Sequence, residues 1–220
     1  MPDFALARRN MVDSQIRTKD VTAPNVIRAF DQVPREAFLP ESQQHRAYID
    51  EDVLVSSGDF DRYVMEPVPL AALMQLADIG RDDIVLDVGC ATGYSTAVLS
   101  LLCSSVVALE SDETLAARAT DTLIAQGYDN AVVVTGPLEK GWPKEAPYDV
   151  ILLGGAVDFV PDALLEQLRE GGRLVCVRGE GLTGEAELYL KRGGVIGTRP
   201  SFNAAVQPLP GFQREAAFVF

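Results

Sequence analysis

The chain has 220 residues, of which 47% are hydrophobic and 23% are charged, as expected of a globular protein with a sizeable core. Its net charge of −13 repels nucleic-acid phosphates, and its densest basic spots are only two residues long, so we expect no nucleic-acid partner. No apolar run approaches the roughly 18 residues that span a bilayer, and the start lacks a signal-peptide pattern. These features predict a cytoplasmic protein without a membrane partner.

The three cysteines, Cys90, Cys103 and Cys176, stand apart in or beside apolar runs. An odd number without close pairing indicates a reducing compartment and argues against a disulfide framework. The single histidine, His45, lies in a polar stretch and is interpreted as a surface residue. We therefore expect no metal site.

The N-terminal third predicts helices and turns. Residues 4 to 20 carry spaced apolar side chains, typical of a partly amphipathic helix. Thr22 is a candidate N-cap for a second helix over 23 to about 32, which has a proline in its first turn. Residues 33–40 form a turn with apolar anchors, and 47–62 form a loop or short ribbon near a ligand. We expect these segments to make a helical cap across one end of a sheet.

The rest of the chain alternates between strand and helix patterns. The expected strands are 84–88, 106–110, 131–135, 150–153 and 173–177, and the expected helices are 67–76, 94–102, 111–126 with Ser111 as N-cap, and 162–169. Such alternation is typical of a parallel sheet with right-handed crossovers. Two or three closing strands, at 186–190, 195–198 and 216–220, are expected to be antiparallel. We divide the chain into a cap and substrate loop, 1–66, and a core, 67–220, which together form one structural domain.

The central motif joins the strand 84–88 to the helix that follows it. Gly89 and Gly93 bracket a loop in which the backbone turns sharply and approaches a ligand closely. The unpaired N–H groups of the following helix face that ligand. The spacing differs from the dinucleotide fingerprint G-x-G-x-x-G, because position 91 is alanine and the second glycine comes four residues after the first.

Two acids flank this loop. Asp87 precedes it, where a carboxylate would repel a pyrophosphate but attract an ammonium group. Glu110 ends the next strand about twenty residues later, where it can accept both hydroxyls of a ribose. This pattern favours S-adenosylmethionine over a dinucleotide, and a glycine-containing turn without ligand is the alternative. The candidate cofactor-binding residues are Asp87, Gly89, Cys90, Ala91, Thr92, Gly93, Glu110 and Ser111.

Several motifs together resemble a known family. They are Met11-Val12-x-x-Gln15, Val33-Pro34-Arg35-Glu36-x-Phe38-x-Pro40, Ala47-Tyr48-x-Asp50, Gly141-Trp142-Pro143, and Leu165-x-Gln167-Leu168-x-x-Gly171-Gly172-Arg173-Leu174. With the central motif, they make the chain similar to protein-L-isoaspartate O-methyltransferases over nearly its whole length. The resemblance implies a Rossmann-like α/β fold with helices on both faces of a seven-stranded, mostly parallel sheet. It also implies S-adenosylmethionine as methyl donor and a carboxylate as acceptor.

Two segments differ from the family pattern. The family carries Thr-Ile-Ser-x-Pro before the first core helix, with a serine that helps to position the reacting groups. Met65 stands at that serine position here and Glu66 follows it, so we consider Met65 and Arg62, which could neutralise Glu66, as catalytic candidates. Where the family has Gly-Asp-Gly, this chain has Gly136-Pro137-Leu138, so Pro137 and Leu138 take the place of residues near the adenine.

Three functions remain open at this point. The first is methylation of isoaspartyl carboxylates in damaged proteins, a protein-repair activity on a protein or peptide substrate. The second is methylation of a small-molecule acceptor by the same fold. The third is a catalytically weak cofactor-binding homologue that acts through a protein partner. We expect a monomer or a homodimer.

Overall fold

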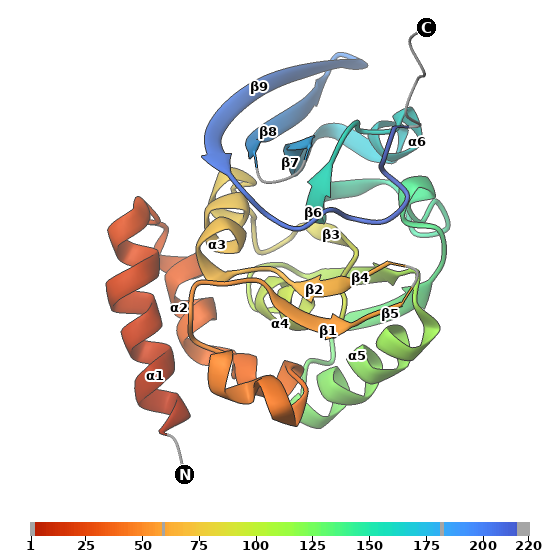
Figure 1. Cartoon of the computed structure of the whole chain (residues 1–220). Helices are drawn as coiled ribbons and strands as arrows, with labels where there is room; N and C mark the ends of the chain where they lie inside the picture. The colour runs from red at the N-terminus through yellow and green to blue at the C-terminus, as the bar shows by residue number, and fades with distance from the viewer. Residues whose placement is uncertain (1–2, 59, 181–182, 215–220) are drawn as a thin grey trace, which may run out of the picture.

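The computed structural model describes residues 3–58, 60–180 and 183–214. They form a seven-stranded sheet with the order β5-β4-β3-β6-β7-β8-β9 (Figure 1). Strands β3 to β7 are parallel, and β8 and β9 extend the sheet as an antiparallel hairpin. The strands are β3 (Ile84–Val88), β4 (Ser105–Glu110), β5 (Ala131–Thr135), β6 (Tyr148–Val157), β7 (Leu168–Glu180), β8 (Thr183–Arg192) and β9 (Val195–Ala204). This topology confirms the expected α/β class.

The strand order reverses between β3 and β6. These two strands pair with each other, although β4 and β5 lie between them in the sequence. In open α/β sheets, ligands bind outside the carboxyl ends of the strands at such a switch point. The loop 89–93 directly follows β3 and therefore lies at this position.

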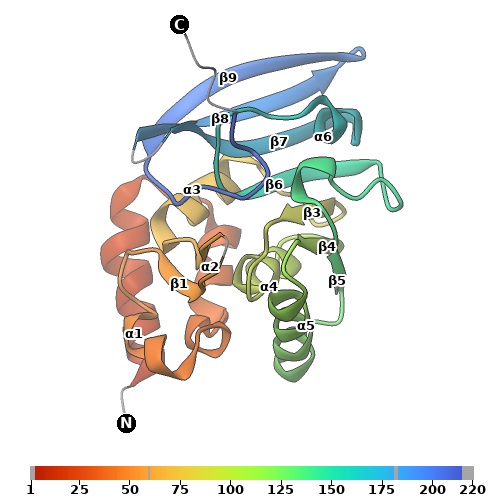
Figure 2. The ribbon, with the colours of Figure 1, turned by 45° about the vertical axis from the view of Figure 1, so that its right-hand side comes forward.

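Alternate strand residues face two apolar layers. Val85 and Val106 belong to a core cluster that also contains residues of the N-terminal helices, of α3 (Pro67–Leu76) and of α4 (Tyr94–Ser100). Leu86 and Val107 face the other side, where they share a cluster with α6 and with Leu209. Figure 2 shows α3 and α4 on one side of the sheet and α6 on the other. The helices are α1 (Phe4–Met11), α2 (Pro24–Gln32), α3 (Pro67–Leu76), α4 (Tyr94–Ser100), α5 (Glu113–Gln126) and α6 (Asp162–Glu166).

The N-terminal segment is helical, as the sequence predicts. After α1 the chain continues through a π-helical turn, Val12–Ile16, and a 3₁₀ turn, Arg17–Lys19. A further 3₁₀ turn, Arg35–Phe38, lies within the predicted turn 33–40. Buried residues of this segment belong to the same core cluster as α3 and α4.

Two predicted N-caps are wrong. The N-cap of α2 is Ala23 rather than Thr22, and the capping oxygen comes from Gln75 of α3, which accepts from the backbone N–H of both residues. The N-cap of α5 is Asp112 rather than Ser111, because the Asp112 carboxylate accepts from the N–H groups two and three residues on. The role predicted for the Thr22 hydroxyl is therefore filled by the distant Gln75 amide, and the role predicted for the Ser111 hydroxyl is filled by the neighbouring Asp112 carboxylate.

The predicted helix 162–169 is too long. Helix α6 ends at Glu166, and β7 already begins at Leu168, which is paired with Tyr148 of β6. The ladder then shifts register before Arg173, where the predicted strand starts. Of the closing strands, β8 and β9 are present and antiparallel, whereas the predicted strand 216–220 lies outside the described residues.

The segment 47–62 contains the first strand of a short ribbon. Strands β1 (Val53–Ser56) and β2 (Arg62–Val64) pair antiparallel and form a second, separate sheet. In Figure 1 this ribbon lies in front of α4 and the end of β4. Within the described part of the chain, no helix is long and apolar enough to cross a bilayer.

Candidate active site

The loop after β3 curls tightly against the end of β4. The backbone N–H groups of Gly89 and Cys90 both donate to the Leu109 carbonyl oxygen, at 2.7 and 3.3 Å. Gly89, Ala91 and Gly93 have φ angles of 81°, 50° and 92°. Glycine adopts this left-handed region freely, whereas alanine does so at a cost of about 1–2 kcal/mol. The loop geometry predicted from the two glycines is therefore present, with one strained residue between them.

The side chain of Asp87 points into the protein interior, beneath the loop. Its side chain is fully buried, and one carboxylate oxygen accepts from Ser95 Oγ and Thr96 Oγ1, both at 2.7 Å. The other oxygen has no hydrogen-bond partner among the described residues. Burial raises the pKa of Asp87 to about 6, although the two hydroxyl groups oppose this shift. The free oxygen leaves this carboxylate able to accept from a cationic ligand.

Glu110 closes the other side of the loop. Its carboxylate accepts from the backbone N–H of Ala91 at 2.7 Å and of Ser111 at 2.8 Å. It also forms a two-point ion pair with Arg62, in which Nη2 lies 2.7 Å from Oε2 and Nε lies 3.3 Å from Oε1. The Glu110 side chain is fully buried, and that of Arg62 is 5% exposed. The carboxylate of Glu110, which is the proposed acceptor for the ribose hydroxyls, is thus already paired with Arg62 of the same chain.

Arg62 is therefore in the site, but it does not neutralise Glu66 as considered above. The cation that lowers the pKa of Glu66 is Arg35, and burial, Asp52 and Asp50 each oppose it more strongly. Burial, followed by the neighbouring Asp52 and Asp50 carboxylates, raises the pKa of Glu66 to about 7.

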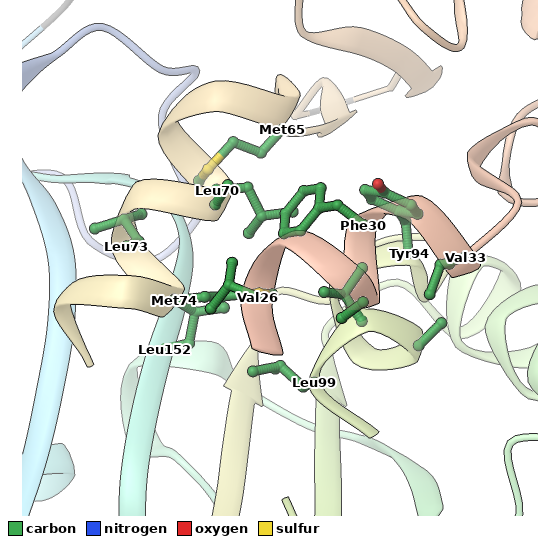
Figure 3. Packing of buried hydrophobic residues seen from close by; sticks show 14 of the residues in the cluster. Val26, Phe30, Val33, Met65, Leu70, Leu73, Met74, Tyr94, Leu99 and Leu152 are labelled. Carbon is green, nitrogen blue, oxygen red and sulfur yellow. The ribbon is translucent and has the colours of Figure 1, made fainter. Parts of the chain in front are cut away.

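Met65 points into the core rather than into an open site. It is 6% exposed and packs in the cluster that contains Leu70 and Tyr94, as Figure 3 shows. Its position at the start of α3 is nevertheless close to the loop, because Met65 and Gly89 line the same small cavity.

The remaining candidate residues differ in burial and in hydrogen bonding. Cys90 is buried, and burial raises the pKa of its thiol, so it acts as an apolar filler. Thr92 is buried, and its hydroxyl has no hydrogen-bond partner among the described residues. Ser111 is exposed and donates its hydroxyl to Glu110. Pro137 is exposed beside the end of β4, whereas Leu138 is buried in the second core cluster.

Sequence reasoning missed two contributors to the site. A methyl group added to Gly89 would lie 2.4 Å from Leu209 Cδ1, so the C-terminal segment covers the loop. Asp52 holds that segment, since its carboxylate accepts from the N–H of Gln207 at 3.2 Å and of Glu66 at 2.9 Å. The sequence predicts no role for Asp52, which lies within the expected loop or short ribbon 47–62. Its only sequence signal is an acid beside an apolar run, shortly before a proline-initiated helix.

The chemistry of the site suits S-adenosylmethionine, but the space does not. The two cavities next to the loop hold about 10 Å³ each, which is room for about one water molecule. Ligand pockets of this kind occupy about 300–1,000 Å³. The guanidinium of Arg62 and the side chain of Leu209 fill the space against Gly89. In this conformation the site does not accommodate a nucleoside.

A reversed strand order, a glycine-bracketed loop at the switch point and an acid at the end of the next strand together define a Rossmann-like methyltransferase. The family model described as "Protein-L-isoaspartate(D-aspartate) O-methyltransferase (PCMT)" matches residues 7–205. The chain belongs to this family. The methyl donor of the family is S-adenosylmethionine.

Individual proteins agree with this assignment. A protein-L-isoaspartate O-methyltransferase of Opitutus terrae is 37% identical over 188 residues, 85% of this chain and 79% of that protein. One from Rhodopseudomonas palustris is 35% identical over 207 residues, 94% and 83% of the two chains. A solved protein-L-isoaspartate O-methyltransferase superposes with a TM-score of 0.82 at 26% identity, covering 93% of this chain and 66% of that longer chain. A second solved structure, from Plasmodium falciparum, superposes on this chain with a TM-score of 0.76 at 20% identity, and this likeness supports the fold alone.

Proposed function

We propose that this chain is an S-adenosylmethionine-dependent O-methyltransferase that methylates isoaspartyl carboxylates in damaged proteins. The observation that carries the proposal is the family match over 7–205. The described structure agrees with it in one further respect, since Asp87 and Glu110 flank the loop at the switch point of the sheet.

The proposed roles follow from the positions of these groups. The free oxygen of Asp87 would accept from the ammonium group of the cofactor, and Glu110 would accept from the ribose hydroxyls. The backbone of residues 89–93 would contact the ligand directly, because Gly89 and Gly93 adopt left-handed φ angles and carry no side chain that would separate the two. Leu209 would exclude water from the same place.

The acceptor chemistry requires no strong base. S-adenosylmethionine supplies an electrophilic methyl group, and a carboxylate acceptor is already ionised at pH 7 because its ordinary pKa is near 4. The protein then contributes chiefly proximity and orientation, which are worth about 7–11 kcal/mol in favourable cases. Loss of the family serine at Met65 is therefore expected to weaken turnover rather than abolish it.

A second candidate function is methylation of a different, small-molecule acceptor. Two observations favour it: Met65 offers no hydroxyl, and Glu66 places an acid beside the acceptor position, where it would repel an anionic acceptor once ionised. A phenolic acceptor that reacts in its neutral form would avoid this repulsion.

The test is transfer of a labelled methyl group from S-adenosylmethionine to an isoaspartyl peptide, beside a peptide of the same sequence with ordinary aspartate. We expect label on the isoaspartyl peptide only. Glu110→Gln is the negative control, since it removes the charge that orders the loop. Label on neither peptide, with cofactor binding intact in calorimetry, would favour the second function. We propose a monomer or homodimer, which sedimentation of the same preparation measures.

A further inference from the structure

The Glu110 carboxylate has no acceptor position left for a ligand. Oε2 accepts from the Ala91 N–H and from Arg62 Nη2, whereas Oε1 accepts from the Ser111 and Asp112 N–H groups, the Ser111 hydroxyl and Arg62 Nε. A carboxylate offers about four lone-pair positions, and these donors fill them. The three backbone donors belong to the loop and to the two residues after β4, and they cannot leave without unfolding the turn. On Oε2 the Arg62 side chain is therefore the donor that can move away.

Arg62 also occupies space that a ligand on this loop requires. Its Nη2 would lie 3.2 Å from a methyl group added to Gly89. Together with Tyr63 and Met65, it lines a water-sized cavity that is also bounded by Gly154, whose backbone packs against Gly89. Withdrawal of this side chain would open the volume beside Gly89 and an acceptor position on Glu110 Oε2, which would keep only the Ala91 N–H.

We infer that Arg62 sets the cofactor affinity of this protein by competing with the ribose of S-adenosylmethionine for Glu110. The inference rests on the proposed function, because it takes the nucleoside to be the ligand of this loop. In the free protein the Arg62–Glu110 pair holds the site closed, and the cofactor binds the fraction of molecules in which the pair is broken. The apparent dissociation constant is the intrinsic one divided by that fraction.

The released guanidinium has acceptable places to go. Asp52 lines the same cavity as Arg62, and Asp61 precedes it in the chain and is exposed. An arginine that exchanges one carboxylate for another, or for water, avoids the large penalty of an unpaired buried charge. The pair can therefore open without disrupting β2, and the cofactor affinity is reduced rather than abolished.

The experiment measures S-adenosylhomocysteine binding by calorimetry with the full chain. The variants are Arg62→Met, which keeps the aliphatic stem, and Arg62→Ala. We expect both to bind about tenfold more tightly or better, since each removes the competitor. In the same proteins, the ligand should raise the melting temperature more than in the wild type. The melting temperature without ligand should fall, because Glu110 is left buried without its cation.

Arg173→Ala is the matched control. Arg173 forms a partly buried ion pair with Asp83 and also donates to the Ala77 and Asp78 carbonyl oxygens. Asp83 precedes β3, at the opposite end of that strand from the loop. This variant should lose stability without a change in ligand affinity. A comparable gain in affinity for Arg173→Ala would overturn the inference, since loosening of the fold alone would then explain the effect.

A double-mutant cycle with Glu110→Gln tests the stated partner. If Arg62 acts through Glu110, Arg62→Met should improve binding by less than about twofold once Glu110 is replaced. An equal improvement in both backgrounds would overturn the inference, because Arg62 would then act by bulk alone. Unchanged or weaker binding by both Arg62 variants, with a wild type that binds, overturns the inference and leaves the proposed function standing. Absence of binding by every protein at millimolar ligand overturns both.

Circular dichroism guards against a folding artefact. Should Arg62→Ala and Arg62→Met not fold, Arg62→Lys retains the charge but offers a single donor group in place of the two-point contact. It should fold and bind more tightly than the wild type, by less than the tenfold expected above. Lysine binding no better than arginine would again overturn the inference.

Discussion

Asp87 accepts a hydrogen bond from Thr96 at 2.7 Å, and the carboxylate that joins β3 to α4 in this way is fully buried. Burial disfavours the ionised form, and nearby Glu110 adds to this effect, so the pKa of Asp87 rises from 3.8 to about 6. The residue expected to attract a ligand cation is therefore a source of instability in the free protein.

Asp87→Asn should remove a pH dependence of stability. The folded pKa is raised, so the folded state binds the proton more tightly than the unfolded state, and the contribution of Asp87 is greatest below about pH 4. It is lost as the pH rises from about 4 to about 6, by about 3 kcal/mol in the free energy of unfolding. Relative to the wild type, Asp87→Asn should gain this amount between pH 4 and pH 7 in urea denaturation.

The exposed Asp82 gives the control, since Asp82→Asn should differ from the wild type by less than about 0.5 kcal/mol. The asparagine at 87 keeps an acceptor for Thr96 but has no charge for an ammonium group, so its S-adenosylhomocysteine binding should weaken. A constant stability difference between Asp87→Asn and the wild type across this pH range would contradict the raised pKa.

The sequence predicts this candidate site from its glycine-bracketed loop and two acids, but it does not predict the side chains that fill the site. Gly89 and Gly93 mark the turn because few other residues adopt positive φ. Glu110 is a signal because a carboxylate at the end of a buried apolar strand requires a hydrogen-bond partner. Arg62 and Leu209 reach the loop from positions 27 residues before and 120 residues after Gly89. No local pattern encodes such contacts, because they depend on how the ribbon and the C-terminal segment fold back over the sheet.

Met65→Ser should raise methyl transfer to an isoaspartyl peptide, because it restores the hydroxyl that the family has at this position. It should also lower the free energy of unfolding by about 2–4 kcal/mol, since the thioether fills a core position 6% exposed. Met65→Leu preserves the volume without the hydroxyl, so it should change stability by less than about 1.5 kcal/mol and leave turnover unchanged. Equal turnover for the serine variant and the wild type would show that the loop is wrongly assigned.

Glu66→Gln should flatten the pH dependence of acceptor binding. Burial and the Asp52 carboxylate raise the pKa of Glu66 to about 7, so this side chain becomes negative as the pH rises through neutrality. The KM for an anionic peptide acceptor should then increase about two- to fivefold between pH 6 and pH 8, the size expected for a half-exposed charge pair.

The glutamine variant should keep the lower KM at both pH values, measured as initial rates of labelled-methyl transfer. Glu41→Gln, at an exposed acid on the N-terminal segment, serves as control and should behave like the wild type. A KM that rises equally in the Glu66 variant would place the pH-sensitive group elsewhere.

The strand pattern predicted the sheet well because parallel strands buried on both faces are continuous apolar runs. The ends of helices were predicted less well. Thr22 carries a preferred capping side chain, yet Gln75 performs the capping from 53 residues away. Leu168 fits a helical pattern but pairs with Tyr148, because ladder hydrogen bonds outweigh local propensity. Both errors arise where a long-range partner competes with a local signal.

Gln75→Ala should therefore weaken the attachment of the N-terminal helices to the core. The Gln75 amide oxygen accepts from the Thr22 and Ala23 N–H groups at 2.7 and 2.8 Å, and its nitrogen donates to the Asp20 carbonyl oxygen at 3.0 Å. Loss of these bonds should lower the free energy of unfolding by about 1–3 kcal/mol. The exposed Gln126→Ala is the control, with an expected change below about 0.5 kcal/mol.

The same denaturation curves test whether residues 1–66 fold with the core. One core cluster contains buried residues from Met11 to Met65 as well as from Leu70 to Val206, so separation of the two parts would expose a continuous apolar interface. We expect a single cooperative transition for the wild type and for Gln75→Ala, with coincident curves from tyrosine fluorescence and far-ultraviolet circular dichroism. Two transitions, of which Gln75→Ala lowers only the first, would identify 1–66 as a unit that unfolds independently.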